Sequence, residues 1–179
     1  MTAQETINRL NAIQAEILRE LPARLEVAGN DVSALIQQRI VQTGKDSDGG
    51  SFTPYSDTPV PAYWYKGRSR NSAGESAVTA LAQQGEYLSY KEFRRLNGLN
   101  TAPKNFEFNG EMWRGVVVVN EGNGSRVSVI IKGGNKTSAD RLKWSSDREN
   151  KNLLEPSEKE IELARLALQN WITAKLTSL

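Results

Sequence analysis

Two runs rich in β-branched residues lie near the middle of the chain, at residues 112–120 and 126–132. Such side chains are stiff at χ1 and suit a pleated, half-buried surface, which favours β-strands. The four residues between the runs, Glu121-Gly122-Asn123-Gly124, include two glycines and an asparagine that tolerate positive φ. The pattern therefore predicts a β-hairpin. Two strands alone are marginal in water, so the hairpin needs helices or further strands against one face.

At the N-terminus, apolar residues recur every three or four positions from Ile7 to Leu21, just before Pro22. The preceding Thr2-Ala3-Gln4-Glu5 has the form of a capping box, so we expect a helix of about five turns. Its apolar stripe has two interpretations: it packs on the core of its own domain, or it forms a seam against a neighbouring subunit. A terminal helix usually docks on its own domain, which favours core packing.

Three further helices are predicted from their caps and apolar periodicity. One follows a turn at residues 27–29 and ends at Gly44. A short one opens at Ser89-Tyr90-Lys91-Glu92, a second capping box, and ends at Gly98. The last opens at Ser157-Glu158-Lys159-Glu160 and carries a long apolar face that we expect to pack on the sheet. The residues of this face are Ile161, Ala164, Leu168, Trp171, Ile172 and Leu176.

Residues 44–50 alternate acidic and small side chains, as calcium-binding loops do. Aligned with an EF-hand loop, the stretch places Gly44 at the first ligand position and Tyr55 at the twelfth, where carboxylates are needed. A flexible turn is therefore the better interpretation.

Residues 53–87 contain three prolines and show no clear periodicity. A segment of this length is too long for an ordinary connection within a compact domain, which predicts an extended loop or arm that orders on a partner. The predicted fold is therefore α+β, with residues 1–179 in a single domain. In it, an antiparallel β-sheet built around the central hairpin is packed by the N-terminal and C-terminal amphipathic helices, with a long irregular arm.

The chain of 179 residues has no Cys and no His. This composition excludes disulfides, cysteine nucleophiles, Ser-His-Asp sites and the usual zinc and haem ligands, so we expect no cofactor and no metal. The net charge of +2 is spread along the chain and identifies no partner. No apolar run approaches the ~20 residues of a membrane span, and the N-terminus lacks a signal-peptide pattern. We expect a protein made in the cytoplasm, with no membrane partner.

Aromatic and basic residues cluster within the expected arm, and they are the candidate partner-binding residues. Three interpretations are open. Trp, Tyr and Arg are common anchors of protein interfaces, aromatic rings beside cations can stack bases and hold phosphates, or the segment folds back on its own domain. The candidate residues are Tyr63, Trp64, Tyr65, Lys66, Arg68 and Arg70.

Short patches in a fixed order resemble the tail-completion and head-tail joining proteins of tailed bacteriophages, also called virion morphogenesis proteins. The resemblance extends over residues 30–178, with Phe52 where that family has Trp and without its His-Gln-x-Gly motif. Ala139 falls where the family has a Tyr-Ala pair. The patches are Leu35-Ile36-Gln37-Gln38-Arg39-Ile40, Asp48-Gly49, Phe52-Thr53-Pro54-Tyr55-Ser56-Asp57-Thr58, Asn109-Gly110-Glu111-Met112-Trp113-Arg114-Gly115 and Leu153-Leu154-Glu155-Pro156-Ser157.

This resemblance implies a structural virion protein, a neck or tail-completion subunit whose copies form a ring between the head connector and the tail. The implied partners are other copies of the chain, the connector or stopper and the tail tube, and genome DNA passes through the ring. The implied location is the virion. A ring needs two different adhesive surfaces on each subunit, and an arm is one way to reach a neighbour.

The alternative function is a nucleic-acid-binding accessory protein that uses the aromatic-basic cluster as a stacking and phosphate-binding strip. An enzyme is third. Glu107 and Glu111 could form a paired-carboxylate hydrolase site, but carboxylates on and beside a strand are commonly solvated or ion-paired. We therefore expect no enzymatic activity.

Overall fold

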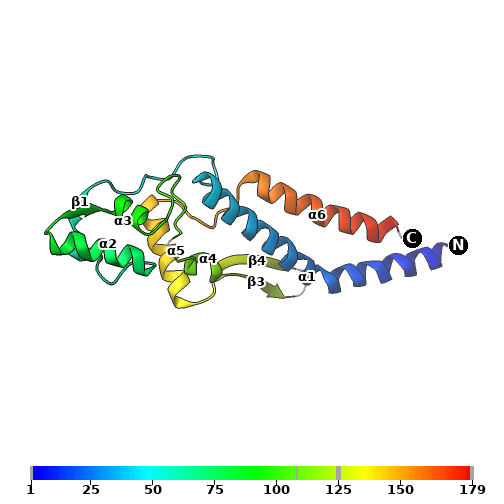
Figure 1. Cartoon of the computed structure of the whole chain (residues 1–179). Helices are drawn as coiled ribbons and strands as arrows, with labels where there is room; N and C mark the ends of the chain where they lie inside the picture. The colour runs from blue at the N-terminus through cyan, green and yellow to red at the C-terminus, as the bar shows by residue number, and fades with distance from the viewer. Residues whose placement is uncertain (1, 108, 124–125, 178–179) are drawn as a thin grey trace.

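The computed structural model describes residues 2–107, 109–123 and 126–177. Helices and strands are combined, and the described residues form two antiparallel sheets of two strands each. The predicted α+β class is confirmed. Figure 1 shows an elongated molecule in which both termini lie at one end and helix α2 (Ser72–Gln83) lies at the other. Within the described ranges, no helix is long and apolar enough to cross a membrane.

Helix α1 (Ala3–Thr43) is continuous over 41 residues. The predicted capping box at its start is confirmed, since the Glu5 N–H donates to Thr2 Oγ1 at 3.2 Å and the Thr2 N–H donates to Glu5 Oε2 at 2.7 Å. Gly44 follows the helix with a φ of 63°, as its predicted role as a stop requires. The predicted break at Pro22 and the turn at residues 27–29 are wrong, because the helix runs through both.

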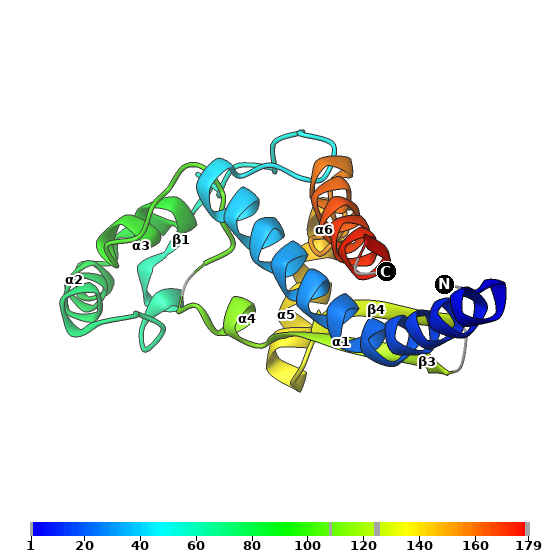
Figure 2. The same cartoon turned by 90° about the vertical axis from the view of Figure 1, so that its right-hand side faces the viewer.

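Strands β3 (Val116–Asn123) and β4 (Arg126–Gly133) form the predicted antiparallel hairpin. Val118 pairs with Ile131, and Asn120 pairs with Val129, so the alternation of a strand directs all four side chains to one face. That face lies against α1 (Figure 2). The hairpin is therefore packed by a helix on one side, as its marginal stability alone requires.

The limits of the hairpin differ from the prediction. Residues 112–114 belong to a short helix, α4 (Glu111–Arg114), and the first strand begins only at Val116. Of the residues predicted to form the turn, Gly122 and Asn123 belong to β3. The last one, Gly124, lies outside the described residues.

Gly29 lies inside α1 because the helix and the hairpin approach closely there. A Cβ atom at this position would stand 2.5 Å from Val129 Cγ1 and 2.7 Å from Val118 Cγ1, closer than carbon atoms pack. The glycine costs about 1 kcal/mol of helix stability relative to alanine, but it permits this contact. Asn120 adds a polar link, because its Nδ2 donates to the Pro22 carbonyl at 3.1 Å.

Helix α6 (Glu158–Thr177) opens at the predicted capping box. The prediction that its apolar face packs on the sheet is wrong, because α6 lies antiparallel beside α1, as Figure 2 shows. Arg39, near the end of α1, binds Glu160 at the start of α6 with an N–O distance of 2.8 Å. Lys175, near the end of α6, binds Glu16 at 2.6 Å. The sheet face that α6 was expected to cover is occupied by α1.

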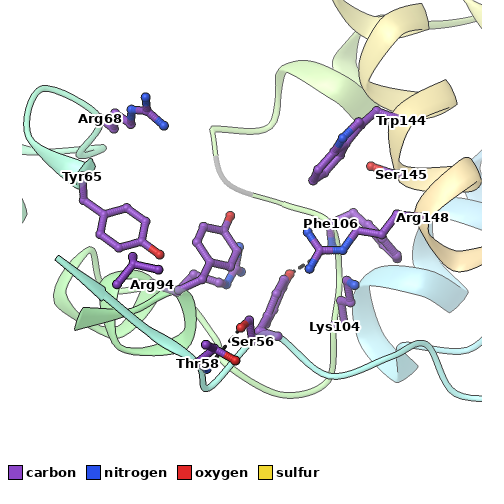
Figure 3. Close-up of a pocket in the computed structure, with 13 residues that line it drawn as sticks. Ser56, Thr58, Tyr65, Arg68, Arg94, Lys104, Phe106, Trp144, Ser145 and Arg148 are labelled. Carbon is purple, nitrogen blue, oxygen red and sulfur yellow. Dashed lines mark hydrogen bonds between the residues drawn. The ribbon is translucent and has the colours of Figure 1, made fainter. Parts of the chain in front are cut away.

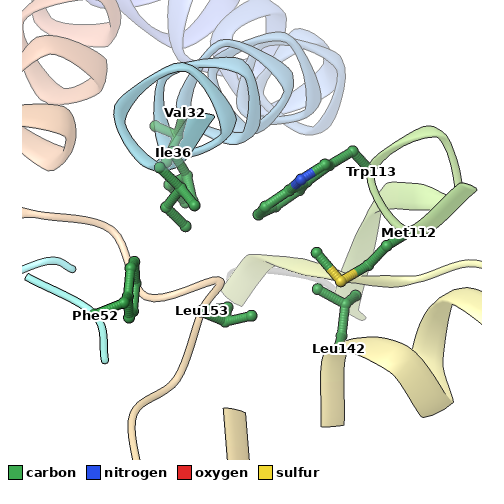
Figure 4. Packing of buried hydrophobic residues seen from close by; sticks show 8 residues of the cluster. Val32, Ile36, Phe52, Met112, Trp113, Leu142 and Leu153 are labelled. Carbon is green, nitrogen blue, oxygen red and sulfur yellow. The ribbon is translucent and has the colours of Figure 1, made fainter. Parts of the chain in front are cut away.

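The main hydrophobic core lies where α1, α4, the hairpin and helix α5 (Lys136–Glu149) meet, as Figure 4 shows. Helix α5 was not predicted, because its sequence is mostly polar, with Leu142 and Trp144 as its large apolar residues. Asn135 caps it by accepting the Ser138 N–H at 2.9 Å. The buried residues of this core are Val32, Ile36, Ile40, Phe52, Met112, Trp113, Leu142 and Leu153.

A second, smaller lobe with its own hydrophobic cluster spans residues 59–99, and we call it the outer lobe. Its capping box at Ser89 and its stop at Gly98 are confirmed. The cluster consists of Ala62, Val78, Leu88 and Phe93, all of them buried. The elements of the lobe are β1 (Pro59–Pro61), the 3-10 helix η1 (Ala62–Tyr65), α2, β2 (Tyr87–Ser89), which pairs with β1, and α3 (Tyr90–Leu96).

The prediction that residues 53–87 form an extended loop or arm is therefore wrong. Most of this segment is built into the outer lobe. The sequence of helix α2 shows no clear apolar period, because it is rich in alanine and serine and only one large side chain, that of Val78, is completely buried. Its start carries a local signal, since Asn71 Oδ1 accepts the Gly74 N–H at 2.7 Å as an N-cap.

Candidate functional site

The predicted aromatic cluster sits on η1, which the outer lobe holds in place. Ala62 anchors the element, since its side chain is buried and its N–H donates to the Glu86 carbonyl at 2.9 Å. Tyr63 and Trp64 point outward and are 61% and 54% exposed. Their rings contact each other edge to face, with centroids 6.5 Å apart. These two rings form an exposed aromatic surface on the outer lobe.

Tyr65 points the other way, into the lobe. Its ring stacks on Phe93 with a centroid distance of 4.4 Å and an interplanar angle of 14°. Burial raises the pKa of the Tyr65 hydroxyl, and the neighbouring Tyr90 adds to this shift. The phenol therefore stays uncharged well above neutral pH. The predicted triplet is thus divided between two surfaces.

The three predicted cations follow in the loop between η1 and α2. The Gly67 N–H donates to Glu75 Oε1 at 2.8 Å, and the Arg70 N–H donates to Asn97 Oδ1 at 2.6 Å, so the backbone of this loop is fixed. The side chains of Lys66, Arg68 and Arg70 are all exposed. Of these three, Arg68 lines a cleft together with Tyr65.

The cleft has a volume of about 560 Å³ and separates the outer lobe from α5 (Figure 3). Tyr65 and Arg68 stand on the outer-lobe side, and Trp144 and Arg148 of α5 stand opposite (Figure 3). The lining combines five aromatic rings with four cationic side chains. These residues are Tyr55, Tyr65, Tyr90, Phe106 and Trp144, and Arg68, Arg94, Lys104 and Arg148.

A buried hydrogen-bond network forms the floor of the cleft and joins the two lobes. The Tyr55 hydroxyl donates to Asn105 Oδ1 at 3.0 Å and accepts the Phe106 N–H at 3.2 Å. Burial raises the pKa of Tyr55, against the opposing effect of the Arg94 charge. The Trp113 Nε1–H donates to the Asn105 carbonyl at 3.3 Å, which ties the floor to the main core.

Arg94 lies at the centre of this network and is only 1% exposed. Its guanidinium donates to the Asn100 carbonyl at 2.9 Å, to the Glu107 carbonyl at 2.7 Å and to Asn105 Oδ1 at 3.1 Å. It also stands 4.0 Å from the centroid of the Tyr55 ring. All three acceptors are neutral, and no carboxylate of the described residues forms an ion pair with it. The floor therefore carries a buried positive charge that no counter-charge cancels.

Unlike Arg94, Lys104 has a counter-charge, because its ammonium forms an ion pair with the nearly buried Glu149 carboxylate. The other oxygen of that carboxylate accepts the Thr53 N–H at 2.8 Å. Burial pushes the pKa of Glu149 upward, but the hydrogen bonds from Lys104 and Thr53 and the Lys104 charge outweigh it, so the pKa lies below the ordinary 4.5.

Replacing Glu149 with Gln is expected to lower the free energy of unfolding by about 1–2 kcal/mol at pH 7. A carboxylate whose pKa is lower in the folded state stabilises the fold above its unfolded pKa, here 4.5, and this contribution disappears as the pH falls through the folded value. Urea unfolding from pH 7 to pH 3 should therefore show the two proteins converging below pH 4.5. A difference that stays constant over the whole range would contradict this role of the charge.

The other acidic residues that the sequence suggested as candidate sites have structural partners. Glu111 forms an ion pair with Arg141 at 2.6 Å, and Glu107 contributes its carbonyl, as described above, to the Arg94 network. In the turn after α1, the buried Asp46 carboxylate accepts the Asp48 and Gly50 N–H groups and pairs with Lys151, as the turn interpretation of this stretch expects. Among the described residues, no group of three or more acidic side chains is placed to hold a metal ion.

Sequence reasoning found Tyr65 and Arg68 of the cleft but not the rest of its lining. Tyr90, Arg94, Trp144 and Arg148 come from α3 and α5, and only the three-dimensional fold brings them together. A scan against protein-family models, a search of curated proteins and a search of solved structures find no match to this chain.

Proposed function

We propose that this chain is a structural virion protein of a tailed bacteriophage, a subunit of a homo-oligomeric ring at the neck between the head connector and the tail. The observation that carries the proposal is a pair of exposed apolar surfaces at opposite ends of an elongated subunit. The resemblance of the sequence patches to tail-completion proteins supports the viral part of the proposal. The role requires shape and adhesion and no catalysis.

The first surface, the helical end, is formed by the N-terminal part of α1 and the outer side of α6. Leu163 and Leu166 on α6 are 47% and 44% exposed, although the other side of the helix already packs on α1. Exposed apolar side chains that gather on one side of a helix are typical of an interface that another protein covers. The exposed large apolar residues of these two helices are Ile7, Leu10, Leu18 and Val27 on α1 and Ile161, Leu163, Leu166 and Leu176 along α6.

The second surface, the aromatic end, lies on the outer lobe. Tyr63 and Trp64 on η1 are exposed there, and Tyr87 on β2 is exposed as well. Large aromatic side chains concentrate binding energy in small patches, and Lys66, Arg68 and Arg70 supply charge beside them. The outer lobe, to which η1 and β2 belong, lies at the end of the molecule opposite the termini (Figure 1).

Two different surfaces at opposite ends favour head-to-tail association. In such a heterologous interface the helical end of one copy contacts the aromatic end of the next, and the chain of contacts closes into a ring when the rotation between copies permits it. A ring of this kind at the neck has a channel for genome DNA, and its two rims can contact the connector or stopper and the tail tube.

Replacing both Leu163 and Leu166 with Glu is expected to convert the ring to monomers, because charges at the centre of an apolar interface cannot be desolvated without a partner. Mass photometry of the purified protein measures this change. The melting temperature should stay close to that of the wild type, since nearly half of each side chain is exposed and neither belongs to a hydrophobic core. Gln169→Glu, which adds a charge at an exposed polar position of the same helix, is the control and should leave the ring intact.

A mixing experiment tests the head-to-tail arrangement itself. Trp64→Ala is expected to disable the aromatic end, while the double leucine variant retains it. Mixed together, the two variants should form a dimer through the one intact pair of surfaces and no larger species. Homodimers formed by each variant alone would instead indicate contacts between identical surfaces. A wild-type protein that stays monomeric, alone and with its neighbouring virion proteins, would refute the proposal.

A further inference from the structure

The cleft between the lobes carries an excess of positive charge, and three of its four cations, Arg94, Lys104 and Arg148, belong to neither end surface. No Asp or Glu of the described residues lines it, whereas four cations do. Lys104 is neutralised by Glu149. Arg94 is buried, and its hydrogen bonds go to neutral oxygens alone. Burying an unpaired charge is costly, and its potential reaches far in surroundings of low polarity, so the cleft attracts anions.

Two further cations stand where a ligand can reach them. Arg68 and Arg148 are exposed on opposite sides of the cleft, and neither forms an ion pair within the described part of the chain. The Arg148 guanidinium stands 5.4 Å from the centroid of the Trp144 ring, which holds it against the wall while its N–H groups remain available. Both side chains can therefore donate hydrogen bonds to an anion that enters the cleft.

Flat rings occupy the space between these cations. Trp144 is 62% exposed although it lines a concave surface, so an apolar ring is left in water. Tyr65 and Tyr90 lie on the other side, 6.4 Å apart, and form a stacked pair with Phe93 behind them. Phenols and indoles are uncharged at neutral pH, so these rings add no negative charge to the cleft.

We propose that the cleft is a nucleotide-binding site, in which the base stacks on Trp144 or on the tyrosine pair and the phosphate binds Arg68 and Arg148. Aromatic rings for bases, beside cations for phosphates, are what proteins use to hold single-stranded nucleic acid without sequence preference. The volume of about 560 Å³ lies within the range of small-ligand sites. The source of the nucleotide is either a single strand or a free nucleotide.

An acidic peptide fits the cleft less well. Extended peptides commonly bind by adding a strand to a sheet edge, through main-chain hydrogen bonds. The strand that borders the cleft is β1, and two of its three residues, Pro59 and Pro61, have no N–H to donate. The contacts that remain are rings and cations, which match a base and a phosphate. This site does not depend on the ring, because its residues belong to one subunit.

The test is binding of a fluorescein-labelled ten-residue thymidylate strand, followed by fluorescence anisotropy at several salt concentrations. Arg68→Ala and Arg148→Ala should each weaken binding about fivefold to tenfold and make the logarithmic salt slope shallower by about 0.7. Trp144→Ala should weaken binding about tenfold and leave the slope unchanged, since it removes stacking and no charge. The control is Arg70→Ala, which changes an exposed cation of the same loop outside the cleft.

Competition identifies the source of the ligand. Displacement of the strand by thymidine monophosphate at similar concentrations indicates a free nucleotide, and displacement by unlabelled strand alone indicates a single strand. Either result, with the variant pattern above, supports the site. Equal loss on Arg68→Ala and Arg70→Ala, equally effective displacement by a polyglutamate peptide, or no binding at low salt would each overturn it. Ring formation is measured separately and is unaffected by these outcomes.

Discussion

Replacing Arg94 with Met is expected to lower the free energy of unfolding by roughly 3 kcal/mol or more. The methionine is of similar length and fills much of the same space, so the effect reports on the polar groups. Three oxygens would lose the Arg94 donor at once: the half-buried carbonyls of Asn100 and Glu107, and the buried Asn105 Oδ1, which keeps the Tyr55 hydroxyl as a donor. Desolvated acceptors without donors are costly, and the contact with the Tyr55 ring would be lost as well. Urea unfolding measures the change.

Two companion variants make this prediction specific. Arg95→Met alters the next residue of α3, whose side chain is exposed, and should change stability by less than about 0.5 kcal/mol. Arg94→Lys keeps the charge but replaces the planar guanidinium with a single ammonium, which cannot reach three divergent acceptors, so it should rescue little. If Arg94→Met and Arg95→Met destabilise equally, the network does not hold the lobes together.

Val118→Asp is the second substitution with a large expected effect, a loss of about 3 kcal/mol. Val118 lies on the hairpin face that packs on α1, with its Cγ1 against Gly29. A carboxylate there would be confined between helix and sheet, beside the apolar side chain of Val129. Val117, the preceding residue, points to the opposite face and is exposed. Val117→Asp should therefore cost about 1 kcal/mol or less.

Thermal and urea unfolding of the two valine variants side by side provide the comparison, because the substitution is identical and only the face differs. Small, equal losses would mean that the hairpin is not buried on one side. A large loss for Val117→Asp alone would mean that the register is shifted by one residue, since such a slip exchanges the two faces of a strand.

The sequence predicts those features correctly that depend on contacts between residues close together in the chain. The capping boxes at Thr2, Ser89 and Ser157 are each formed within four residues, and all three open helices as predicted. The hairpin is predicted from its two runs of β-branched residues. Gly29 shows the limit of local signals. A glycine in a turn and a glycine in a helix that packs closely on a strand cannot be told apart from the sequence alone. Val129, the strand residue that explains it, lies one hundred positions further along the chain.

The residues of the candidate site likewise differ in whether a local pattern in the sequence predicts them. Tyr65 and Arg68 were found because aromatic and basic residues crowd together in the sequence there. Trp144 and Arg148 stand in a polar stretch that gave no sign of a helix, and their role depends on which side of α5 meets the outer lobe. Arg94 was hidden for another reason: an arginine in a short helix is normally a surface residue, and only its burial reveals the charge in the cleft.

Because α1 is long, a small bend within it would move its N-terminal tip by a large distance. With a rise of 1.5 Å per residue, the part of the helix before Pro22 forms a rod about 30 Å long, which runs past the hairpin toward the terminal end in Figure 1. Proline is a common point of bending in helices, and a change of direction of about 10° at Pro22 would move the tip by about 5 Å. In the ring that we propose, such a bend would change the spacing between neighbouring subunits and the bore of the ring, and Lys175 of α6, which binds Glu16, would move with the tip.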